Sequence, residues 1–329
     1  MKVLITGGTG FIGSRLALNS KKRGHEVVVI GQTNTPAEHE NKKELESTNI
    51  KVILGAITEE EKLKQAVSNC ELVFHLAAAQ HEANVSDKYF HDVNVEGTRS
   101  IIEASIEAGV KRFVHGSTIG VYGSAMDGKI DEETPLLPVN IYGVTKREGE
   151  KLALSYADKI PLSVVRISET YGPGDRRLLK LFKAIQKQIF FMIGNGENKH
   201  QLIYVDDLID GMYLAAERPE AVGQIFVLAG KEVLSTNEMV AAISNAVETP
   251  LKKMHSPMLP FLILAIIMEK TLSPFGIQPP LHRRRLDFFR KSFYFSRQKS
   301  KNLLGFEPSI DFVTGTRETA RWYKSKGLL

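Results

Sequence analysis

The sequence predicts an α/β protein in which a doubly wound parallel sheet is followed by a smaller, mostly helical lobe. Short apolar runs alternate with helical stretches from residue 1 to about residue 170, as in parallel sheets covered on both faces. The first run, Val3–Ile5, passes directly into a glycine-rich turn, and the alternation ends at Tyr171–Gly174. We therefore expect a first domain at residues 1–172 and a second lobe at residues 173–329, with some strands and helices of the second part returning to the first.

Six apolar runs have the length and the β-branched composition of buried strands. They are Val3–Ile5, Val27–Ile30, Val52–Leu54, Leu72–Leu76, Phe113–Val114 and Leu162–Ile167. Helices are expected between them at Ser14–Arg23, Glu59–Val67 and Val93–Ala108. The first and the last of these helices end at a glycine, the usual stop residue.

The second lobe is expected to be helical at Leu178–Lys187, Asp207–Glu217 and Ser235–Val247. The last helix opens with Ser235-Thr236-Asn237-Glu238, the pattern of a capping box, in which serine and glutamate satisfy free backbone N–H groups. Gln201–Tyr204 and Gln224–Leu228 are expected to be strands. A ligand cleft between the two lobes follows from this arrangement.

Bulk properties exclude several classes of protein. The 329 residues are 43% hydrophobic and 25% charged, as in ordinary globular proteins. The single cysteine, Cys70, excludes a disulfide within the chain, and no signal peptide is expected before the glycine-rich turn, so we predict a cytoplasmic protein. The densest basic cluster, Arg283–Arg285, is expected to be a solvated face. No nucleic-acid-binding motif accompanies it, so no nucleic-acid partner is expected, and no metal site either.

One apolar stretch, Phe261–Met268, needs a separate explanation. It is far shorter than the roughly 20 residues that span a bilayer. We expect a buried helix, or a lid over an apolar pocket, and no membrane contact. A monotopic membrane contact is the alternative, because apolar and basic segments adjoin here.

Gly7, Gly10 and Gly13 follow the first strand at the spacing of a dinucleotide-binding turn. Glycines leave room for a pyrophosphate against bare backbone, and the next helix directs its first N–H groups at that phosphate. A tight turn without a ligand is the alternative. A second, independent signal supports the dinucleotide: Tyr142 and Lys146 form a Tyr-x-x-x-Lys pair.

Tyr142 and Lys146 are about one helical turn apart, so their side chains share one face of a helix. A tyrosine, with a pKa of about 10, is a poor acid–base catalyst at neutral pH. An ammonium beside the phenol would lower that pKa toward the working range. Upstream, Ser117 and Thr118 end an apolar strand, where a hydroxyl points into the ligand crevice of a doubly wound sheet.

With these motifs the chain resembles an extended short-chain dehydrogenase/reductase of the epimerase/dehydratase superfamily, which has a Rossmann-type fold. The resemblance covers essentially the full length. The matching segments are Thr6–Gly13, His75–Ala78, Asn94–Thr98, Ser117-Thr118 with Val121–Gly123, Tyr142 with Lys146, Arg166, Tyr171–Pro173, Tyr204–Asp207 and Leu304–Pro308.

The resemblance implies a role for each matched residue. Tyr142 would exchange a proton with a substrate hydroxyl or carbonyl, and Thr118 would hydrogen-bond the same oxygen. Lys146 would tune Tyr142 and hold the nicotinamide ribose, while Asn94 would hold the helix geometry or a water behind Lys146. Ser117 is expected to be a strand-end residue only. The coenzyme NAD(P)(H) would contact Gly7, Gly10, Phe11, Ile12, Gly13, Gln32, Ile57 and Ala77, together with Tyr142 and Lys146.

Two departures from the family pattern concern the coenzyme. Relatives that prefer NAD end the second strand with an acid that binds the adenosine ribose, whereas this chain has Gly31 and then Gln32. The usual adenine-contacting Asp is also missing, because the chain reads Gly55-Ala56-Ile57, where the N–H of Ile57 could serve the adenine. Without a carboxylate to repel a 2′-phosphate, NADP is slightly favoured over NAD.

The substrate residues point in two directions. Nucleotide-sugar relatives bind a diphosphate through an Arg, where this chain has His200, and Arg285 in the basic cluster could compensate. Glu169 stands where sugar-acting relatives have a substrate-facing Asn, and it could bind a hydroxyl or pair with an Arg such as Arg176. The stretch around Phe261–Met268 instead resembles members that act on hydroxysteroids.

We therefore predict an NAD(P)-dependent oxidoreductase or epimerase that acts at a secondary alcohol or ketone of a small molecule, with a nucleotide sugar as the first choice. Ile119-Gly120 stand where dehydratases carry Asp-Glu, which argues against dehydration. A 3β-hydroxysteroid or long-chain β-hydroxy/β-keto dehydrogenase is the alternative. A non-catalytic dinucleotide sensor is the alternative of another class.

A homodimer is also compatible with the sequence. Relatives pair through the helix at Val93–Ala108 and the helix that starts near Tyr142. The positions expected to face outward, namely Ile101, Ser105, Leu152 and Tyr156, form a mixed surface that can support a C2 dimer without demanding one.

Overall fold

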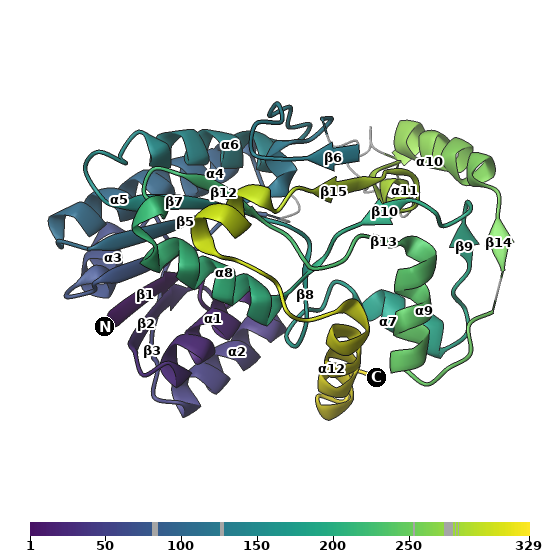
Figure 1. Cartoon of the computed structure of the whole chain (residues 1–329), viewed down its shortest axis with the longest axis horizontal. Coiled ribbons are helices and arrows are strands. Elements are labelled where there is room, and N and C mark those ends of the chain that lie inside the picture. Colours follow the sequence, from purple (N-terminus) through teal and green to yellow (C-terminus); the bar gives the residue numbers. More distant parts are fainter. Residues whose placement is uncertain (81–84, 126–127, 253, 273–278, 280, 282) are drawn as a thin grey trace.

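A seven-stranded, all-parallel sheet forms the centre of the molecule, in the order β12-β7-β5-β4-β1-β2-β3 (Figure 1). The computed structural model describes residues 1–80, 85–125, 128–252, 254–272, 279, 281 and 283–329, with residues 283–285 described by their backbone alone. The strands are β1 (Lys2–Thr6), β2 (Glu26–Gly31), β3 (Lys51–Leu54), β4 (Leu72–His75), β5 (Arg112–Thr118), β7 (Leu162–Ile167) and β12 (Ile225–Leu228). The predicted parallel sheet is confirmed, and each predicted run overlaps one of these strands.

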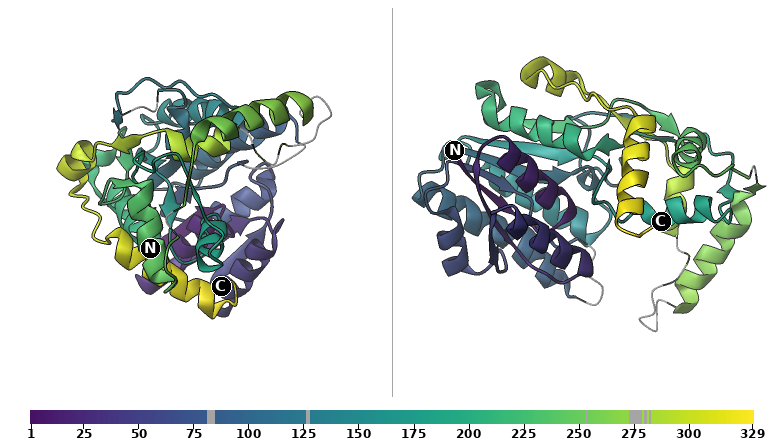
Figure 2. Two further views of the ribbon diagram at one scale, coloured as in Figure 1. Left: turned by 90° about the vertical axis from the view of Figure 1, so that its right-hand side faces the viewer. Right: turned by 90° about the horizontal axis from the view of Figure 1, so that it is seen from below.

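Helices cover both faces of this sheet (Figures 1 and 2). One layer contains α1 (Phe11–Lys22), α2 (Pro36–Ser47) and α8 (Val205–Glu217), and the other contains α3 (Glu60–Val67), α5 (Gly97–Glu107) and α6 (Ile141–Leu154). Successive strand residues point to opposite faces, so Val3 and Ile5 join the first core while Leu4 joins the second. This arrangement leaves the carboxyl ends of the strands free to carry a site.

The sequence did not predict α2, because its only buried residue is Leu45 and no apolar stripe marks it. Its start nevertheless has a clear signal, since Thr35 and Glu38 form a capping box. Ahead of α5, a short helix α4 (Asp87–His91) and a π-helical turn (Asp92–Glu96) continue into one helical stretch.

The second lobe has its own core, built from α7 (Leu179–Gln186), α9 (Thr236–Ala246) and α12 (Phe312–Ser325). The capping box at the start of α9 is confirmed. Two further helices, α10 (Met258–Leu272) and α11 (Arg283–Arg290), pack against each other at the outer end of this lobe (Figure 1). No helix in the described part of the chain is long and apolar enough to cross a membrane.

Two short strand pairs join residues before 172 to residues after it. They are β6 (Gly128–Ile130) with β15 (Phe293–Phe295) and β8 (Thr170–Tyr171) with β11 (Ile203–Tyr204). Two other pairs lie within the second part of the chain, namely β9 (Met192–Ile193) with β14 (His255–Ser256) and β10 (Lys199–His200) with β13 (Leu234–Ser235). β12 and α8 also follow residue 172 but pack on the central sheet.

Two expectations about surfaces are wrong. The helix containing Phe261–Met268 was expected to be buried, but Ala265 is its only buried side chain and Ile263, Leu264 and Ile267 are exposed. Ile101 and Ser105 were expected to face outward, yet both are fully buried inside the protomer, where Ser105 Oγ donates to the carbonyl of Ile101. The helical phase of α5 therefore presents other residues to solvent.

Candidate active site

Gly7 and Gly10 in the turn between β1 and α1, and Gly13 at the start of α1, have different roles. Gly7 has a φ of +67°, and a Cβ there would lie 2.8 Å from the backbone nitrogen of Ala77. A Cβ on Gly13 would collide with the carbonyl oxygen of Gly7, so both positions are closed by the chain itself. A Cβ on Gly10 would meet only that same oxygen, at 3.2 Å, and otherwise open space. A pyrophosphate fits in this space, so Gly10 is the position where the lack of a side chain makes room for a ligand.

The start of α1 is suited to hold that phosphate. Gly10 is the N-cap residue and no side chain of the described residues caps the helix, so the N–H groups of Phe11, Ile12 and Gly13 remain for a ligand. The ring of Phe11 lies under the loop that follows β8, because a Cβ on Gly174 would be 2.8 Å from its Cδ2. The phosphate position is thus lined by backbone on one side and by this loop on the other.

The residues expected to hold the adenosine half lie along the same edge of the sheet. Gln32 is exposed directly after β2, and the buried side chain of Ile57 packs on Gly97, so only the backbone of Ile57 is left for a coenzyme. The N–H of Ala77 donates to Thr6 Oγ1 at 3.1 Å, which fixes the loop after β4 beside the glycine turn.

A carboxylate that the sequence analysis missed lies beside this adenosine end. Glu38, in the first turn of α2, accepts hydrogen bonds from the N–H groups of Asn34 and Thr35, both at 2.8 Å. The strand-end acid that NAD-preferring relatives carry is absent here, but a carboxylate three residues into the next helix lies close to the same loop. The capping-box pattern Thr35-x-x-Glu38 could have revealed it.

Tyr142 and Thr118 lie close to each other. Tyr142 stands in the first turn of α6, where Asn140 accepts the N–H of Gly143 at 2.9 Å, and a Cβ on Gly120 would be 3.6 Å from the Tyr142 ring. Burial raises the pKa of Tyr142, while a hydrogen bond with Thr118 and the charge of Arg177 partly offset the rise. The expected lowering by an adjacent ammonium is therefore not what the structure shows, because the cation that acts on Tyr142 is Arg177.

Lys146 lies one turn further on, in a deeply buried position. Its Nζ donates to the carbonyl oxygen of Gly116 at 2.7 Å. Burial lowers the pKa of Lys146 to about 8, an effect that Glu150 partly opposes. Two buried imidazoles, His75 and His115, lie near it, and burial holds their pKa values far below the ordinary range, to about 3 for His75. Both rings are therefore neutral neighbours of the ammonium at neutral pH.

Asn94 links the π-helical turn to the loop after β4 and to α6 through hydrogen bonds. It stands in the π-helical turn, a distortion that often marks functional sites. Its Oδ1 accepts the N–H of Ala79 at 2.8 Å, and its Nδ2 donates to the Ala79 carbonyl at 3.1 Å and to Thr145 Oγ1 at 2.9 Å. These contacts support the structural half of its expected role, which is to hold α6 against the loop after β4.

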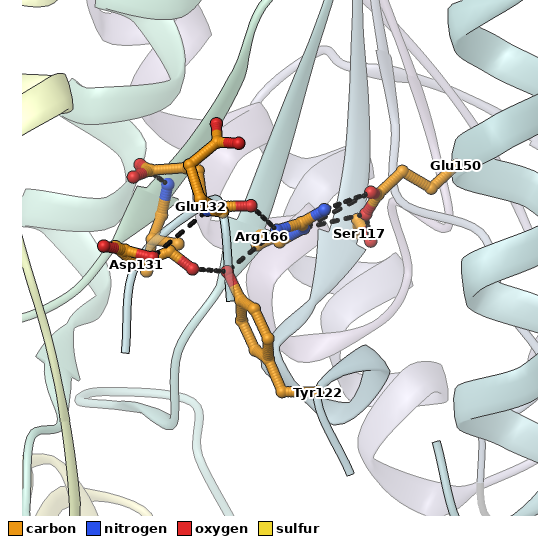
Figure 3. Close-up of polar contacts among 8 residues, drawn as sticks. Ser117, Tyr122, Asp131, Glu132, Glu150 and Arg166 are labelled. Atoms are coloured by element: carbon orange, nitrogen blue, oxygen red, sulfur yellow. Dashed lines mark hydrogen bonds and ion pairs between the residues drawn. The ribbon is translucent and has the colours of Figure 1, made fainter. Parts of the chain in front are cut away.

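A buried ion pair behind Lys146 was also missed (Figure 3). Arg166 on β7 approaches both carboxylate oxygens of Glu150 on α6, with Nη2–Oε1 at 2.7 Å, and each side chain is only 3% exposed. Ser117 donates to the same carboxylate at 2.6 Å, which agrees with its expected strand-end role. The signal was present in the sequence, because Glu150 follows Lys146 by four residues and shares its helix face.

The other side of the Arg166 guanidinium is satisfied as well (Figure 3). Its Nη1 donates to the Tyr122 hydroxyl at 2.8 Å and to the carbonyl of Glu132 at 2.9 Å, and Tyr122 in turn donates to the carbonyl of Asp131. The network connects β5, β7 and α6 to the loop after β6, and so fixes the helix that carries Tyr142 and Lys146.

The predicted substrate residues Glu169 and His200 lie beside each other, with His200 Nδ1 4.0 Å from Glu169 Oε2. His200 Nε2 lies 2.9 Å from Asn198 Nδ2 and 3.1 Å from Thr236 Oγ1, while its buried Nδ1 has no hydrogen-bond partner in the described part of the chain. The His200 ring stacks on Phe288, and burial lowers its pKa. His200 is therefore neutral at neutral pH and does not replace the charge of the diphosphate-binding Arg of nucleotide-sugar relatives.

Two further expectations about substrate contacts can be compared with the structure. Arg176 pairs with Glu40 on α2 and not with Glu169, so the suggested Glu169–Arg176 pair is wrong. The side chain of Arg285 lies outside the described residues. A cation that the sequence analysis missed is Arg177, which is half exposed on the loop after β8 and acts on Tyr142 through its charge.

The central sheet is doubly wound and carries a glycine turn and the side chains of Tyr142, Thr118 and Lys146 at its carboxyl edge. This combination defines an NAD-binding enzyme of the extended short-chain dehydrogenase/reductase type. The sequence profile of the NAD dependent epimerase/dehydratase family matches residues 3–229. The chain belongs to that family.

Similar proteins differ in what their names say they act on. A Bacillus subtilis protein named as an uncharacterized UDP-glucose epimerase, YtcB, is 30% identical over 263 residues, covering 74% of this chain and 82% of its own. A mouse sterol-4-alpha-carboxylate 3-dehydrogenase (decarboxylating) is 27% identical over 341 residues, covering 97% and 90%. The crystal structure of a Bacillus cereus UDP-glucuronic acid 4-epimerase in complex with NAD aligns over 99% of both chains, with a TM-score of 0.78 and 25% identity.

Proposed function

We propose that the protein is an NAD-dependent epimerase or oxidoreductase that acts on a secondary hydroxyl of a nucleotide sugar. The observation that carries the proposal is that Thr118 and Tyr142 both lie beside Gly120, at the same sheet edge as the open side of Gly10 and the ammonium of Lys146. A non-catalytic sensor would have no use for this acid–base group.

Each residue has a distinct task in this proposal. A bound nicotinamide coenzyme supplies the hydride chemistry. Tyr142 takes the proton of the substrate hydroxyl, and Thr118 holds the same oxygen in line through its hydroxyl. Lys146, which a pKa of about 8 leaves mostly protonated at pH 7, donates to the coenzyme ribose, and the charge of Arg177 stabilises the Tyr142 phenolate electrostatically. Asn94 and the Glu150–Arg166 pair hold α6 in place for this step.

The residues beyond Tyr142 favour a polar substrate with an anionic part. The half-exposed carboxylate of Glu169, beside the His200 ring, is suited to accept a hydrogen bond from a sugar hydroxyl. Arg177, half exposed and close enough to act on Tyr142, is suited to a carboxylate or phosphate oxygen. An apolar alcohol loses its main support, because the apolar helix that was expected to line its pocket faces outward.

For the coenzyme we propose NAD, although the sequence slightly favoured NADP. The Glu38 carboxylate lies at the N-terminus of α2 and already uses the N–H groups of Asn34 and Thr35. A 2′-phosphate at this end would meet a negative charge and find these donors occupied. A ratio of kcat/KM values that favours NADP would contradict this assignment.

A cytoplasmic homodimer, as the sequence suggested, remains part of the proposal. The lone Cys70 thiol is buried, and burial raises its pKa to about 11, which suits a reducing compartment. A contact through α5 and α6 would use Glu103 and Tyr156, which share a hydrogen bond of 2.6 Å, because Ile101 and Ser105 are buried. Light scattering that shows only monomer at micromolar concentration would reject the dimer.

The test of the main proposal is a substrate panel. Purified protein with NAD is incubated with UDP-glucose, UDP-glucuronic acid, UDP-N-acetylglucosamine and a 3β-hydroxysteroid, while reduced nicotinamide is followed by absorbance and sugar stereochemistry by NMR. We expect either a sugar with one inverted stereocentre and no net formation of NADH, or an oxidised sugar together with NADH. The Tyr142→Phe variant should form neither product. Turnover of the hydroxysteroid alone would overturn the proposal.

A further inference from the structure

The helix α10 exposes an apolar surface that the proposed reaction does not use. Leu259, Ile263 and Ile267 recur at every fourth residue, so they form one stripe along the helix, and they are 64%, 50% and 52% exposed. Leu264 is exposed beside them. The opposite side of α10 is occupied, because Ala265 and Leu262 pack against Leu286 of α11.

Two more apolar side chains are exposed on the segments before β9 and β14. Phe191, just before β9, contacts Phe261 of α10, with tilted rings whose centroids are 5.8 Å apart. Met254, just before β14, is exposed too, and its carbonyl accepts the N–H of Met192. We call Leu259, Ile263, Leu264 and Ile267 the α10 patch. An exposed apolar helix face of this kind is unusual on a protein that meets only water.

The segment of the chain that carries the α10 patch is basic. Residues 251–291 contain eight lysines and arginines but only two acids, Glu269 and Asp287. Among the described side chains, Lys252, Lys270 and Arg290 are exposed. A second copy of the chain docked symmetrically on this patch would bring the same positive charges face to face, which disfavours it. An anionic surface would instead complement them.

We propose that the α10 patch docks the enzyme on an anionic phospholipid bilayer, as a peripheral contact. A helix of 15 residues is roughly 22 Å long, shorter than the hydrocarbon core of about 30 Å, so it lies in the interface and does not cross it. The helix α10 lies at the end of the molecule opposite β1–β3 (Figures 1 and 2), so a membrane at this end leaves those strands free of contact. The apolar stripe inserts among the acyl chains while the basic residues meet the lipid headgroups.

The experiment is co-sedimentation of the full chain with vesicles. Wild type is compared on vesicles of phosphatidylcholine and of phosphatidylcholine with an equal share of phosphatidylglycerol. The apolar variant Leu259→Gln/Ile263→Gln/Ile267→Gln is expected to lose at least about tenfold in partitioning onto the anionic vesicles, because three inserted side chains become polar. The charge variant Lys252→Gln/Lys270→Gln/Arg290→Gln is expected to lose its preference for phosphatidylglycerol.

A matched control carries three changes at exposed apolar residues elsewhere, Val233→Gln/Leu303→Gln/Val313→Gln, and should bind vesicles like wild type. Equal thermal midpoints and NAD affinities show that every variant is folded. Equal binding of wild type and the apolar variant would overturn the proposal. So would a wild-type dimer in sedimentation velocity that the apolar variant converts to monomer while neither binds vesicles, because a second copy would then be the occupant.

Discussion

Arg166 and Glu150 form a fully buried ion pair between β7 and α6, with Nη2–Oε1 at 2.7 Å and both side chains 3% exposed. Removing one partner leaves the other charge without compensation in the interior, which costs about 3–5 kcal/mol of stability. We expect Glu150→Gln or Arg166→Met to destabilise by about that amount in urea unfolding. The double variant Glu150→Leu/Arg166→Met should lose less than the sum of the single changes, because neither charge is stranded. Additive losses would show that the two side chains do not act as a pair.

Gly10→Val tests the coenzyme position. The added side chain enters the open space over Gly10, so NAD binding measured by calorimetry should be lost while the thermal midpoint stays within a few degrees. Gly10→Ala, with a single Cβ at 3.2 Å from the Gly7 oxygen, should bind more weakly than wild type but still measurably. Gly13→Val is the contrasting change and should unfold the turn. Wild-type NAD affinity in Gly10→Val would mean that the pyrophosphate lies elsewhere.

Tyr142→Phe keeps the ring and removes the proton. We expect kcat to fall at least about 10²-fold, as is typical when general acid–base catalysis is lost, with NAD affinity nearly unchanged. Tyr294→Phe serves as the control and should be as active as wild type. Undiminished turnover by Tyr142→Phe would refute the mechanism.

Lys146→Met should abolish activity and yet stabilise the fold. At pH 7 the wild-type lysine is charged in both the folded and the unfolded state, and a folded pKa lowered from 10.5 to about 8 corresponds to a penalty of about 3 kcal/mol. Losing the hydrogen bond to Gly116 costs about 1 kcal/mol of stability, so we expect the free energy of unfolding to rise by about 2 kcal/mol in the variant. The gain should shrink as the pH rises from 8 to 10.5, because the wild-type ammonium then sheds its proton in the fold. The exposed Lys151→Met is the control, and a loss of stability in Lys146→Met would contradict the prediction.

The buried histidines predict sensitivity to acid. The pKa values of His75 and His115 lie far below 6.5 in the fold because both rings are desolvated, so the unfolded state binds more protons at acid pH. Stability should therefore be full above pH 6.5 and fall below it by up to about 1.4 kcal/mol per pH unit for each ring. His115→Phe, whose ring replaces two nitrogens that have no partner among the described residues, should reduce that slope by about half. An unchanged slope would show that other groups control acid unfolding.

The sequence predicted the sheet well because each buried parallel strand is a short run of apolar, β-branched residues, which can be recognised without knowledge of the tertiary structure. It missed α2, whose polar helix buries one leucine, since periodicity of apolar residues was the criterion used. It misplaced Ile101 and Ser105 because the helical phase around α5 depends on tertiary packing and on the π-helical turn before it. Phe261–Met268 was expected in the core because of its apolar composition alone. Composition does not show whether another part of the chain is available to cover that helix.

The site was predictable where chemistry demands particular residues at fixed spacing, as for the glycine turn and for Tyr142 with Lys146. Contacts that join distant segments were not. The resemblance placed His200 where relatives carry an Arg, but only the structure shows that its ring stacks on Phe288 and lies 2.9 Å from Asn198 Nδ2. Arg177 escaped notice because its effect on Tyr142 depends on how the loop after β8 folds back.

The position of β12 beside β7 has a consequence for synthesis on the ribosome. When residues 1–172 have emerged, the nascent sheet still ends at β7, whose outward N–H and C=O groups have no partner strand. The edge closes only after Ile225–Leu228 and α8 have been translated, so the nascent protein must stay protected from edge-to-edge association through much of its elongation. A fragment cut at residue 172 would keep that exposed edge permanently, and we expect it to aggregate instead of folding as an isolated coenzyme-binding domain.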